Sequence, residues 1–397
     1  MLRPNTLALT ALLGLLTALG PLSTDMYLPS LPAIGLALAA DTAAVQLTLS
    51  VFLLGFAAGQ VVYGPLSDRF GRRPPLLAGL ALFVAASVLC ALAPTIALLT
   101  AARFLQALGA AGPIVLARAV VRDLYEGPAA ARELSRMGTI MGFVPAAAPI
   151  LGGFLQRFLG WQANFAVATV IGLLGILVVA GKLPETLANA GHGRLSVAGI
   201  FAGYAALARH RGFLAWLALM SLTYGGLFAY ISGSSFVLQG VYHLGEVAFG
   251  VAFAIGVGGY IAGTLIAQVL VPRLGLERTV AFGVIALATG GLAMLVLVLF
   301  GPGHPAEIVG PMTLYLAGVG LVMPQAMAGA LAPFPQRAGT ASSMAGFVQM
   351  LTGAIIGMLV GRSLGAGALP LPIAVATTGV AAAALFHLSR RVRRSLA

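Results

Sequence analysis

Long apolar stretches recur along the whole of this 397-residue chain, and they constrain its fold more than any other feature. A stretch of roughly 17 to 25 apolar residues can cross the hydrocarbon core of a bilayer as a helix. Only 8% of the residues are charged, against about 25% in soluble domains. Twelve such stretches are found, at residues 6–34, 45–66, 75–92, 96–121, 134–158, 161–179, 213–238, 247–271, 280–300, 308–331, 341–360 and 371–388. A β-barrel would need shorter segments of alternating polarity, and the sequence contains none. The sequence therefore predicts an all-α integral membrane protein with twelve transmembrane helices.

The positive charges are divided unequally between the two sides that twelve spans would define. The net charge is +12, and apart from Arg103, which falls inside a span, only Arg157 and Arg362 lie on the side away from the chain ends. This asymmetry follows the positive-inside rule and predicts that both termini are cytoplasmic. The excess charge would meet anionic membrane lipid. There is no basic patch with aromatic residues on a soluble domain, so a nucleic-acid partner is not expected.

The chain divides into two halves around its longest polar interruption, residues 182–212. We expect a six-helix bundle at 1–181, a cytoplasmic linker at 182–212 and a second six-helix bundle with a basic cytoplasmic tail at 213–397. Within the linker, residues 195–208 predict an amphipathic helix on the membrane surface. The short turn between the second and third spans of each half contains Arg-x-Gly, at 69–71 and at 273–275. This weak internal repeat is consistent with two parallel bundles.

Two ionisable residues, Asp25 and Arg103, fall deep inside predicted spans. At 1.5 Å per residue, Asp25 lies ~14 Å and Arg103 ~11 Å from the same predicted surface. Intramembrane ionisable groups usually mark ion or substrate paths. We therefore expect these two side chains to share one cavity and to couple transport to proton movement. In the alternative, Asp25 caps a helix segment broken by Pro21 and Pro29, and Arg103 bonds free carbonyl groups of the first helix.

The loop at 64–74 is predicted to form a cytoplasmic gate. A glycine in it permits a tight turn, and Pro74 would begin the next helix. Acids contribute little to membrane orientation, so Asp68 needs another explanation. Placed near the start of the eleventh span, it could lock the two halves together through the helix dipole. The predicted gate residues are Gly64, Asp68, Arg69, Gly71, Arg72 and Arg73.

Two further groups of residues are candidates for movement and for substrate binding. Prolines and glycines inside the fifth span predict a kinked, closely packed element that is either a hinge or a static bend. Its members are Gly142, Pro145, Pro149, Gly152 and Gly153. Aromatic and amide side chains could line an apolar pocket. These are Tyr27, Gln106, Phe228, Tyr230, Phe236, Gln325 and Gln349. The five histidines and single cysteine have no metal-site spacing, so no metal or cofactor is expected.

Four motifs resemble a known family, the major facilitator superfamily. Residues 64–74 look like its signature loop, 103–109 resemble its fourth-helix arginine motif, and 148–153 are similar to its antiporter motif, with Ala148 where the family usually has glycine. Residues 22–32 resemble the first-helix motif of the twelve-helix drug:proton antiporters, more narrowly the bicyclomycin and chloramphenicol resistance branch. The resemblance implies two six-helix bundles, proton coupling at the buried arginine, and small drug-like substrates.

We therefore expect a proton-coupled antiporter that exports small hydrophobic compounds, driven by the proton gradient, from a multi-pass position in a bacterial plasma membrane. The alternative is a proton-linked uptake permease for a small metabolite. An enzyme is not expected, because the chain offers no paired nucleophile and base and no metal cluster. Two bundles that enclose one path need no partner chain, so we expect a monomer.

Overall fold

The computed structural model describes residues 6–187, 197–334 and 337–394, and within these ranges every regular element is a helix. Among the described residues, twelve helical segments are long and apolar enough to cross a membrane. Their bounds are Leu7–Ala37, Thr42–Phe70, Arg73–Ala91, Ile96–Leu124, Arg132–Leu159, Gln162–Lys182, Arg211–Val241, Glu246–Leu274, Leu276–Phe300, Ala306–Leu331, Gly339–Ser363 and Pro370–Leu388. All twelve predicted spans are confirmed. Most differ from the prediction by a few residues at their ends, where polar residues continue the helix.

The chain forms two compact units, and each is described by itself. The first contains Met1–Ala40 and Val51–Leu195, and the second contains Asp41–Ser50 and Ser196–Ala397. The boundary at 195/196 falls inside the predicted linker, whereas the start of the second span, Asp41–Ser50, groups with the second unit. The expected division into 1–181, a linker at 182–212 and 213–397 stays a prediction, and residues 188–196 of that linker lie outside the described ranges.

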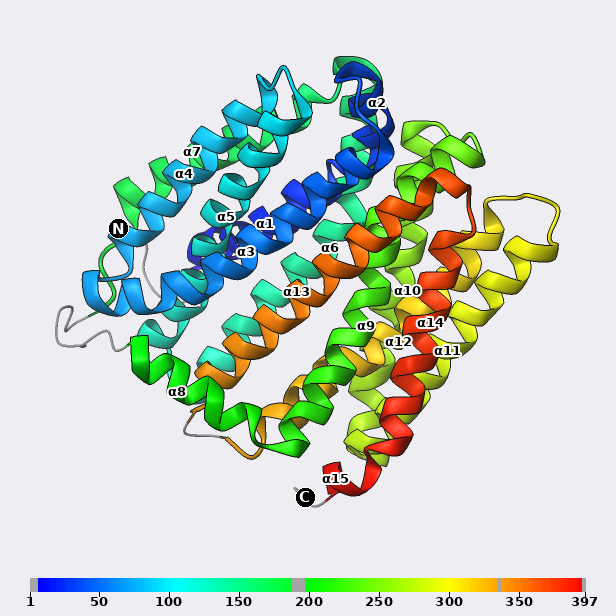
Figure 1. The fold of residues 1–397 in the computed structure, drawn as a ribbon. Coiled ribbons are helices and arrows are strands. Elements are labelled where there is room, and N and C mark those ends of the chain that lie inside the picture. The colour runs from blue at the N-terminus through cyan, green and yellow to red at the C-terminus, as the bar shows by residue number, and fades with distance from the viewer. Residues whose placement is uncertain (1–5, 188–196, 335–336, 395–397) are drawn as a thin grey trace. The chain divides into compact units, whose positions relative to one another are not determined.

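The first unit is built from α1 (Leu7–Asp25), η1 (Leu28–Ser30), α2 (Leu31–Ala37), most of α3 (Thr42–Phe70), α4 (Arg73–Ala91), α5 (Ile96–Leu124), α6 (Gly127–Leu159) and α7 (Gln162–Lys182) (Figure 1). Helix α1 packs against α5, α6 and α7, while α4 packs against α5 and α7. Proline residues at 29 and 32 lack an N–H donor, and the first span accordingly changes from α-helix to 3₁₀-helix and back at this point.

The second unit repeats this arrangement. It contains α8 (Val197–Ala208), α9 (Arg211–Ser235), η2 (Phe236–Val241), α10 (Glu246–Leu274), α11 (Leu276–Phe300), α12 (Ala306–Leu331), α13 (Ala338–Ser363), η4 (Leu364–Ala366), α14 (Pro370–Leu388) and α15 (Arg390–Arg394). Helix α9 packs against α12, α13 and α14, and α11 against α12 and α14. These pairs correspond to the pairs of the first unit, so the internal repeat extends from the loop sequence to the packing of the helices.

Small residues allow equivalent helix pairs of the two units to approach closely. A Cβ atom at Gly109 of α5 would lie 2.5 Å from the backbone nitrogen of Phe83 in α4. In the equivalent pair, a Cβ atom at Gly318 of α12 would lie 2.7 Å from the carbonyl oxygen of Gly283 in α11. Both distances are too short for any larger residue without movement of a backbone, which is the usual role of glycine between membrane helices.

The helix in the linker differs from its prediction. Residues Val197–Ala208 form α8, as expected, but Tyr204 is their only side chain with a polar group. The polar face that defines an amphipathic helix is therefore missing. Arg209 and Arg211 come after the last residue of α8, so their charges do not contribute a polar face to this helix. Helix α8 packs against α9 and α13 of its own unit.

Candidate functional site

Arg103 lies near the start of α5, and its side chain is completely buried in the first unit. Its Nη1 group donates to the carbonyl oxygen of Ser23 at 3.2 Å and to Oε1 of Gln106 at 2.6 Å. Gln106 in turn donates through Nε2 to Oγ of Ser87 at 2.9 Å. Since Ser23 belongs to α1 and Ser87 to α4, this hydrogen-bonded chain joins three helices around one buried positive charge.

Three aromatic rings surround the guanidinium of Arg103. Its central carbon lies 4.1 Å from the ring centroid of Phe52, 4.6 Å from that of Tyr27 and 5.9 Å from that of Phe165. Such cation–π contacts contribute about 2 kcal/mol when they are shielded from water. The Nε and Nη2 groups have no hydrogen-bond acceptor among the described atoms. An unpaired buried donor costs about 1–3 kcal/mol, so this arginine is held by aromatic rings with part of its bonding capacity unused.

Asp25 is the last residue of α1, and its side chain is also buried. Within the described part of the chain, no ion pair joins Asp25 to Arg103 or to another cation. Arg103 reaches α1 at a backbone carbonyl, which is the alternative that the sequence left open. The expectation that the two groups share one cavity and couple transport to protons stays a prediction. Among the described residues, Asp25 is an intramembrane carboxylate with no ion-pair partner.

The predicted hinge residues lie in α6, which continues without interruption through Pro145 and Pro149. Gly152 lies directly against the backbone carbonyl of Met26, the residue after Asp25, and leaves no room there for a Cβ atom. Gly153 is buried beside it, whereas Gly142 has no atom close enough to require a glycine. The glycine pair therefore lets α6 approach α1 at the residue next to the buried carboxylate. Movement at this point stays a prediction.

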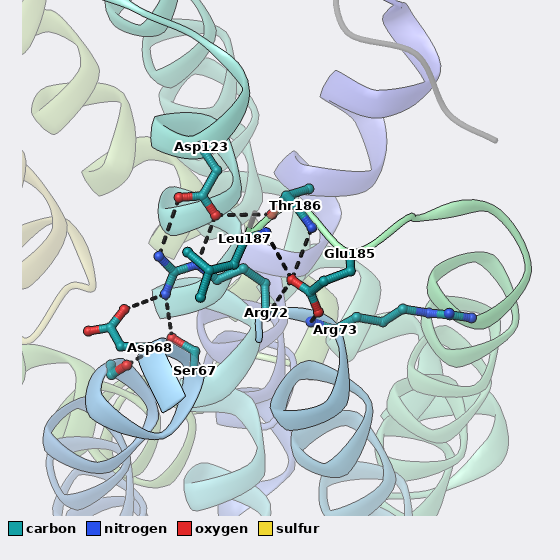
Figure 2. Close-up of polar contacts among 9 residues, drawn as sticks. Ser67, Asp68, Arg72, Arg73, Asp123, Glu185, Thr186 and Leu187 are labelled. Atoms are coloured by element: carbon teal, nitrogen blue, oxygen red, sulfur yellow. Dashed lines mark hydrogen bonds and ion pairs between the residues drawn. The ribbon is translucent and has the colours of Figure 1, made fainter. Parts of the chain in front are cut away.

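The loop after α3 is organised around the side chain of Arg72 (Figure 2). Arg72 donates through Nε to Oδ2 of Asp123 at 2.8 Å and through Nη1 to Oδ1 of Asp68 at 2.6 Å. A further bond from Nη1 reaches Oγ of Ser67 at 2.8 Å. The ion-pair partner Asp123 comes from the end of α5, so Arg72 connects the loop to a helix about 50 residues further along the chain.

Glu185, just after α7, closes the same loop from the other side (Figure 2). Its carboxylate accepts hydrogen bonds from the backbone N–H groups of Arg72 and Arg73, at 2.8 and 3.0 Å, and from those of Thr186 and Leu187. Burial by itself would raise the pKa of Glu185, but these four N–H donors outweigh it and hold the pKa below its usual value. The first turn of a helix has unpaired N–H groups, which explains why a carboxylate binds there.

The other predicted gate residues surround this cluster. Gly71 has a φ of +86°, and the Glu185 carboxylate lies so close that a Cβ atom there would be 2.5 Å from Oε2. Arg69 is exposed and stacks on Phe70, while Arg73 donates to the carbonyl of Ala180. Gly64 has no close neighbour that demands a glycine, although its carbonyl accepts a bond from Ser67. The predicted lock between Asp68 and the start of the eleventh span stays a prediction.

The predicted pocket residues are distributed over both units. Tyr27 and Gln106 surround Arg103 in the first unit. In the second unit Phe228 stacks on Tyr224 and Tyr230 stacks on Phe253. Phe236 begins the π-helical segment η2, and Gln325 and Gln349 are buried in α12 and α13. Their role in binding a substrate stays a prediction.

Three partners in the loop cluster were missed by sequence reasoning: Asp123, Glu185 and Ser67. The sequence does contain an indication of the two acids, Asp123 and Glu185. Asp68 was chosen because an acid on the basic side of the membrane is not explained by orientation. The same argument applies to Asp123 and Glu185, which lie on that side as well. Ser67 carried no comparable signal, because serine is common in membrane helices.

Comparisons with known proteins agree with this architecture. The model of the Major Facilitator Superfamily matches residues 13–358. An uncharacterized MFS-type transporter of Bacillus subtilis, YdgK, is 36% identical over 89% of both chains. A bicyclomycin resistance protein homolog of Haemophilus influenzae is 31% identical over 88% of this chain and 87% of its own. Multidrug resistance protein D of Escherichia coli is 28% identical over 90% of each chain.

Solved structures have the same fold at much lower identity. A crystal structure of a D-xylose-proton symporter superposes with a TM-score of 0.76, at 17% identity, over 95% of this chain and 96% of the other. A peptide transporter of the POT family gives 0.79 at 14% identity, over 97% and 95% of the two chains. The twelve spans, the repeated packing and the family match agree: the chain is a transporter that belongs to the Major Facilitator Superfamily.

Proposed function

We propose that this transporter exports small, mostly apolar compounds from the cytoplasm in exchange for protons, by alternating access. The relatives named for bicyclomycin resistance and multidrug resistance support the substrate class and the outward direction. The positive-inside distribution supports cytoplasmic termini in a bacterial inner membrane. The cluster of Arg72 with Ser67, Asp68, Asp123 and Glu185, at the basic end of the first unit, then serves as part of the cytoplasmic gate.

The observation that carries the coupling scheme is the burial of Asp25 with no ion-pair partner among the described residues. A lone intramembrane acid is costly unless it binds a proton or faces a polar path. In the outward-open state, Asp25 takes a proton from outside. In the inward-open state, substrate displaces that proton toward the cytoplasm. Arg103, whose Nε and Nη2 groups have no acceptor among the described atoms, supplies the positive charge for that stage of the cycle.

The proton gradient supplies enough energy for this exchange. Moving one charge across 100 mV is worth ~2.3 kcal/mol. For one proton per neutral substrate molecule, this corresponds to a gradient of roughly 50-fold. A pH difference of one unit adds about tenfold.

The test compares Asp25→Asn with Asp25→Glu. Asparagine preserves size and hydrogen bonding but cannot ionise, whereas glutamate keeps the carboxyl group. In inverted vesicles, where export appears as accumulation of substrate inside the vesicle, we expect Asp25→Asn to abolish both proton-driven accumulation and substrate-induced proton release. Asp25→Glu should retain part of both. Substrate counterflow, which needs binding and conformational change without net proton movement, should survive in Asp25→Asn. Full proton-driven efflux by Asp25→Asn would contradict the proposal.

The substrate is identified by a drug-susceptibility panel with cells expressing the wild type or Asp25→Asn. Direction is decided separately, in right-side-out and inverted vesicles. Proton-driven accumulation in inverted vesicles supports export. Accumulation in right-side-out vesicles would instead support the alternative, an uptake permease for a small metabolite.

A further inference from the structure

The short helix α15 at the C-terminal end is fixed to the second unit by one buried arginine, Arg393. Its side chain forms a two-pronged ion pair with Glu277 in the first turn of α11. Nε donates to Oε1 and Nη2 donates to Oε2, both at 3.1 Å. Parallel bonds of this kind fix the orientation of both partners, because the guanidinium and the carboxylate are planar.

Arg393 is held from two further helices. Nη1 donates to the carbonyl oxygen of Phe386 in α14 at 2.6 Å. The guanidinium lies 4.0 Å from the ring centroid of Phe386 and 5.0 Å from that of Trp216 in α9. One side chain therefore joins α15 to α9, α11 and α14, and Figure 1 shows α15 directly below the end of α14. The position of α15 relative to the start of α11 is thus fixed by several independent contacts.

Other arginines are close in sequence to the two partners of this ion pair. Arg390 and Arg391 precede Arg393 in α15, Arg278 follows Glu277 in α11, and all three side chains are exposed. Within the described part of α9–α15, Glu277 is the one carboxylate at the end of the unit where α11 begins and α14 ends. Its charge is already neutralised by Arg393. Glu246 and Glu307 lie in the first turns of α10 and α12, at the opposite ends of their helices. Each of these three exposed arginines lies within three residues of Glu277 or Arg393 in the sequence, and we refer to them as the arginine patch.

We propose that Arg278, Arg390 and Arg391 bind the phosphate headgroup of an anionic phospholipid, and that the Glu277–Arg393 pair holds this site in shape. The arginine fork matches phosphate oxygens, and basic residues next to a span attract anionic lipid. The patch lies where one span begins, at Leu276, and another ends, at Leu388. Leu388 is 84% exposed and offers a surface for an acyl chain, which a free phosphate ion would not need.

The first experiment uses the purified full-length protein in a neutral detergent, titrated with phosphatidylglycerol, phosphatidylcholine or inorganic phosphate, with the thermal unfolding temperature as the readout. We expect a saturable stabilisation by phosphatidylglycerol that is larger than that by phosphatidylcholine and absent with phosphate. The variant Arg278→Gln/Arg390→Gln/Arg391→Gln should weaken the apparent affinity for phosphatidylglycerol at least tenfold.

A matched control removes three exposed arginines from the first unit on the same side of the membrane, as Arg118→Gln/Arg122→Gln/Arg132→Gln. We expect this control to bind phosphatidylglycerol within about twofold of the wild type. An equal loss in both triple variants would mean general charge attraction and would overturn the proposal. So would equal stabilisation by inorganic phosphate, which would identify a free-anion site.

The role of the ion pair is tested with Arg393→Gln in a Trp161→Phe background, where Trp216 is the single tryptophan. Loss of the stacked guanidinium should change the emission of Trp216 and, although Arg393 is buried, should also weaken phosphatidylglycerol binding several-fold. Arg393→Lys, which keeps the charge without the fork, should give an intermediate affinity. A changed emission with unaltered lipid affinity would show that the pair does not organise the site.

Discussion

The loop between α3 and α4 and the loop between α10 and α11 both turn the chain at a glycine with a positive φ. Each contains Arg-x-Gly, and φ is +86° at Gly71 and +80° at Gly275. Glycine is the default residue at such positions, because other residues pay a steric penalty there. The next helix begins within two residues in both cases. The backbone of the turn is thus common to the two units.

The side chains that fasten the two loops are different, and their charges are reversed. In the first unit the loop supplies a cation, Arg72, which binds Asp123, while Glu185 after the last span caps the new helix. In the second unit the loop supplies an acid, Glu277, and the segment after the last span supplies Arg393. The segment that follows the sixth span of each unit returns to the same loop. The repeat therefore preserves the place of the contact and not the sign of the charge.

Removing the cation of the first loop should produce the largest effect. Arg72→Ala would leave Asp123, which is only 14% exposed, without its cationic partner, and we expect the free energy of unfolding to fall by about 3 kcal/mol. Transport should fall at least tenfold. Arg72→Lys should recover only part of both, because an ammonium group cannot reproduce the fork. Thermal or denaturant unfolding and vesicle transport measure the two effects.

The matched control for this prediction is Arg69→Ala in the same loop. Arg69 is exposed and stacks on Phe70, so its loss should cost less than about 0.5 kcal/mol. If Arg69→Ala were as damaging as Arg72→Ala, net charge and not the hydrogen-bonded cluster would account for the loop's stability.

The two glycines should respond unequally to alanine. Both substitutions place a side chain at a positive φ, at a cost of about 1–3 kcal/mol. Gly71→Ala also meets the carboxylate of Glu185, whereas Gly275 has no atom within 4 Å of a Cβ atom. We therefore expect Gly71→Ala to be the more destabilising in unfolding measurements. In a Glu185→Ala background its additional cost should disappear, and an unchanged cost there would show that the carboxylate is not the obstacle.

The smallest expected effect is the pH dependence of the first loop. The N–H donors lower the pKa of Glu185 in the folded protein, so its contribution to stability is complete above the usual value of 4.5. It is lost as the pH falls through the lowered pKa. The difference in unfolding temperature between wild type and Glu185→Gln should therefore shrink on acidification from pH 6. A difference independent of pH over that range would refute this account of the capping bond.

Pattern reasoning located the spans and the first loop because both depend on local sequence. The apolar stretches set the number of helices, and Gly71 with Pro74 set the turn between two of them. The same reasoning placed Arg103 deep in a span, but it could not choose between a carboxylate and a backbone carbonyl as its partner. A depth measured along a helix does not say which face of that helix a side chain occupies.

The sequence by itself determined the membrane class, the twelve helices, the repeated turn and the isolation of Asp25 and Arg103 from other charges, because the cost of burying polar groups in lipid acts on each segment separately. Only the tertiary structure decided which groups meet. It surrounded Arg103 with rings from three other spans, joined Arg72 to Asp123, and brought Arg393 to Glu277. The two ion pairs join residues that are 51 and 116 positions apart in the chain, and only the packing of the helices brings them within hydrogen-bond distance.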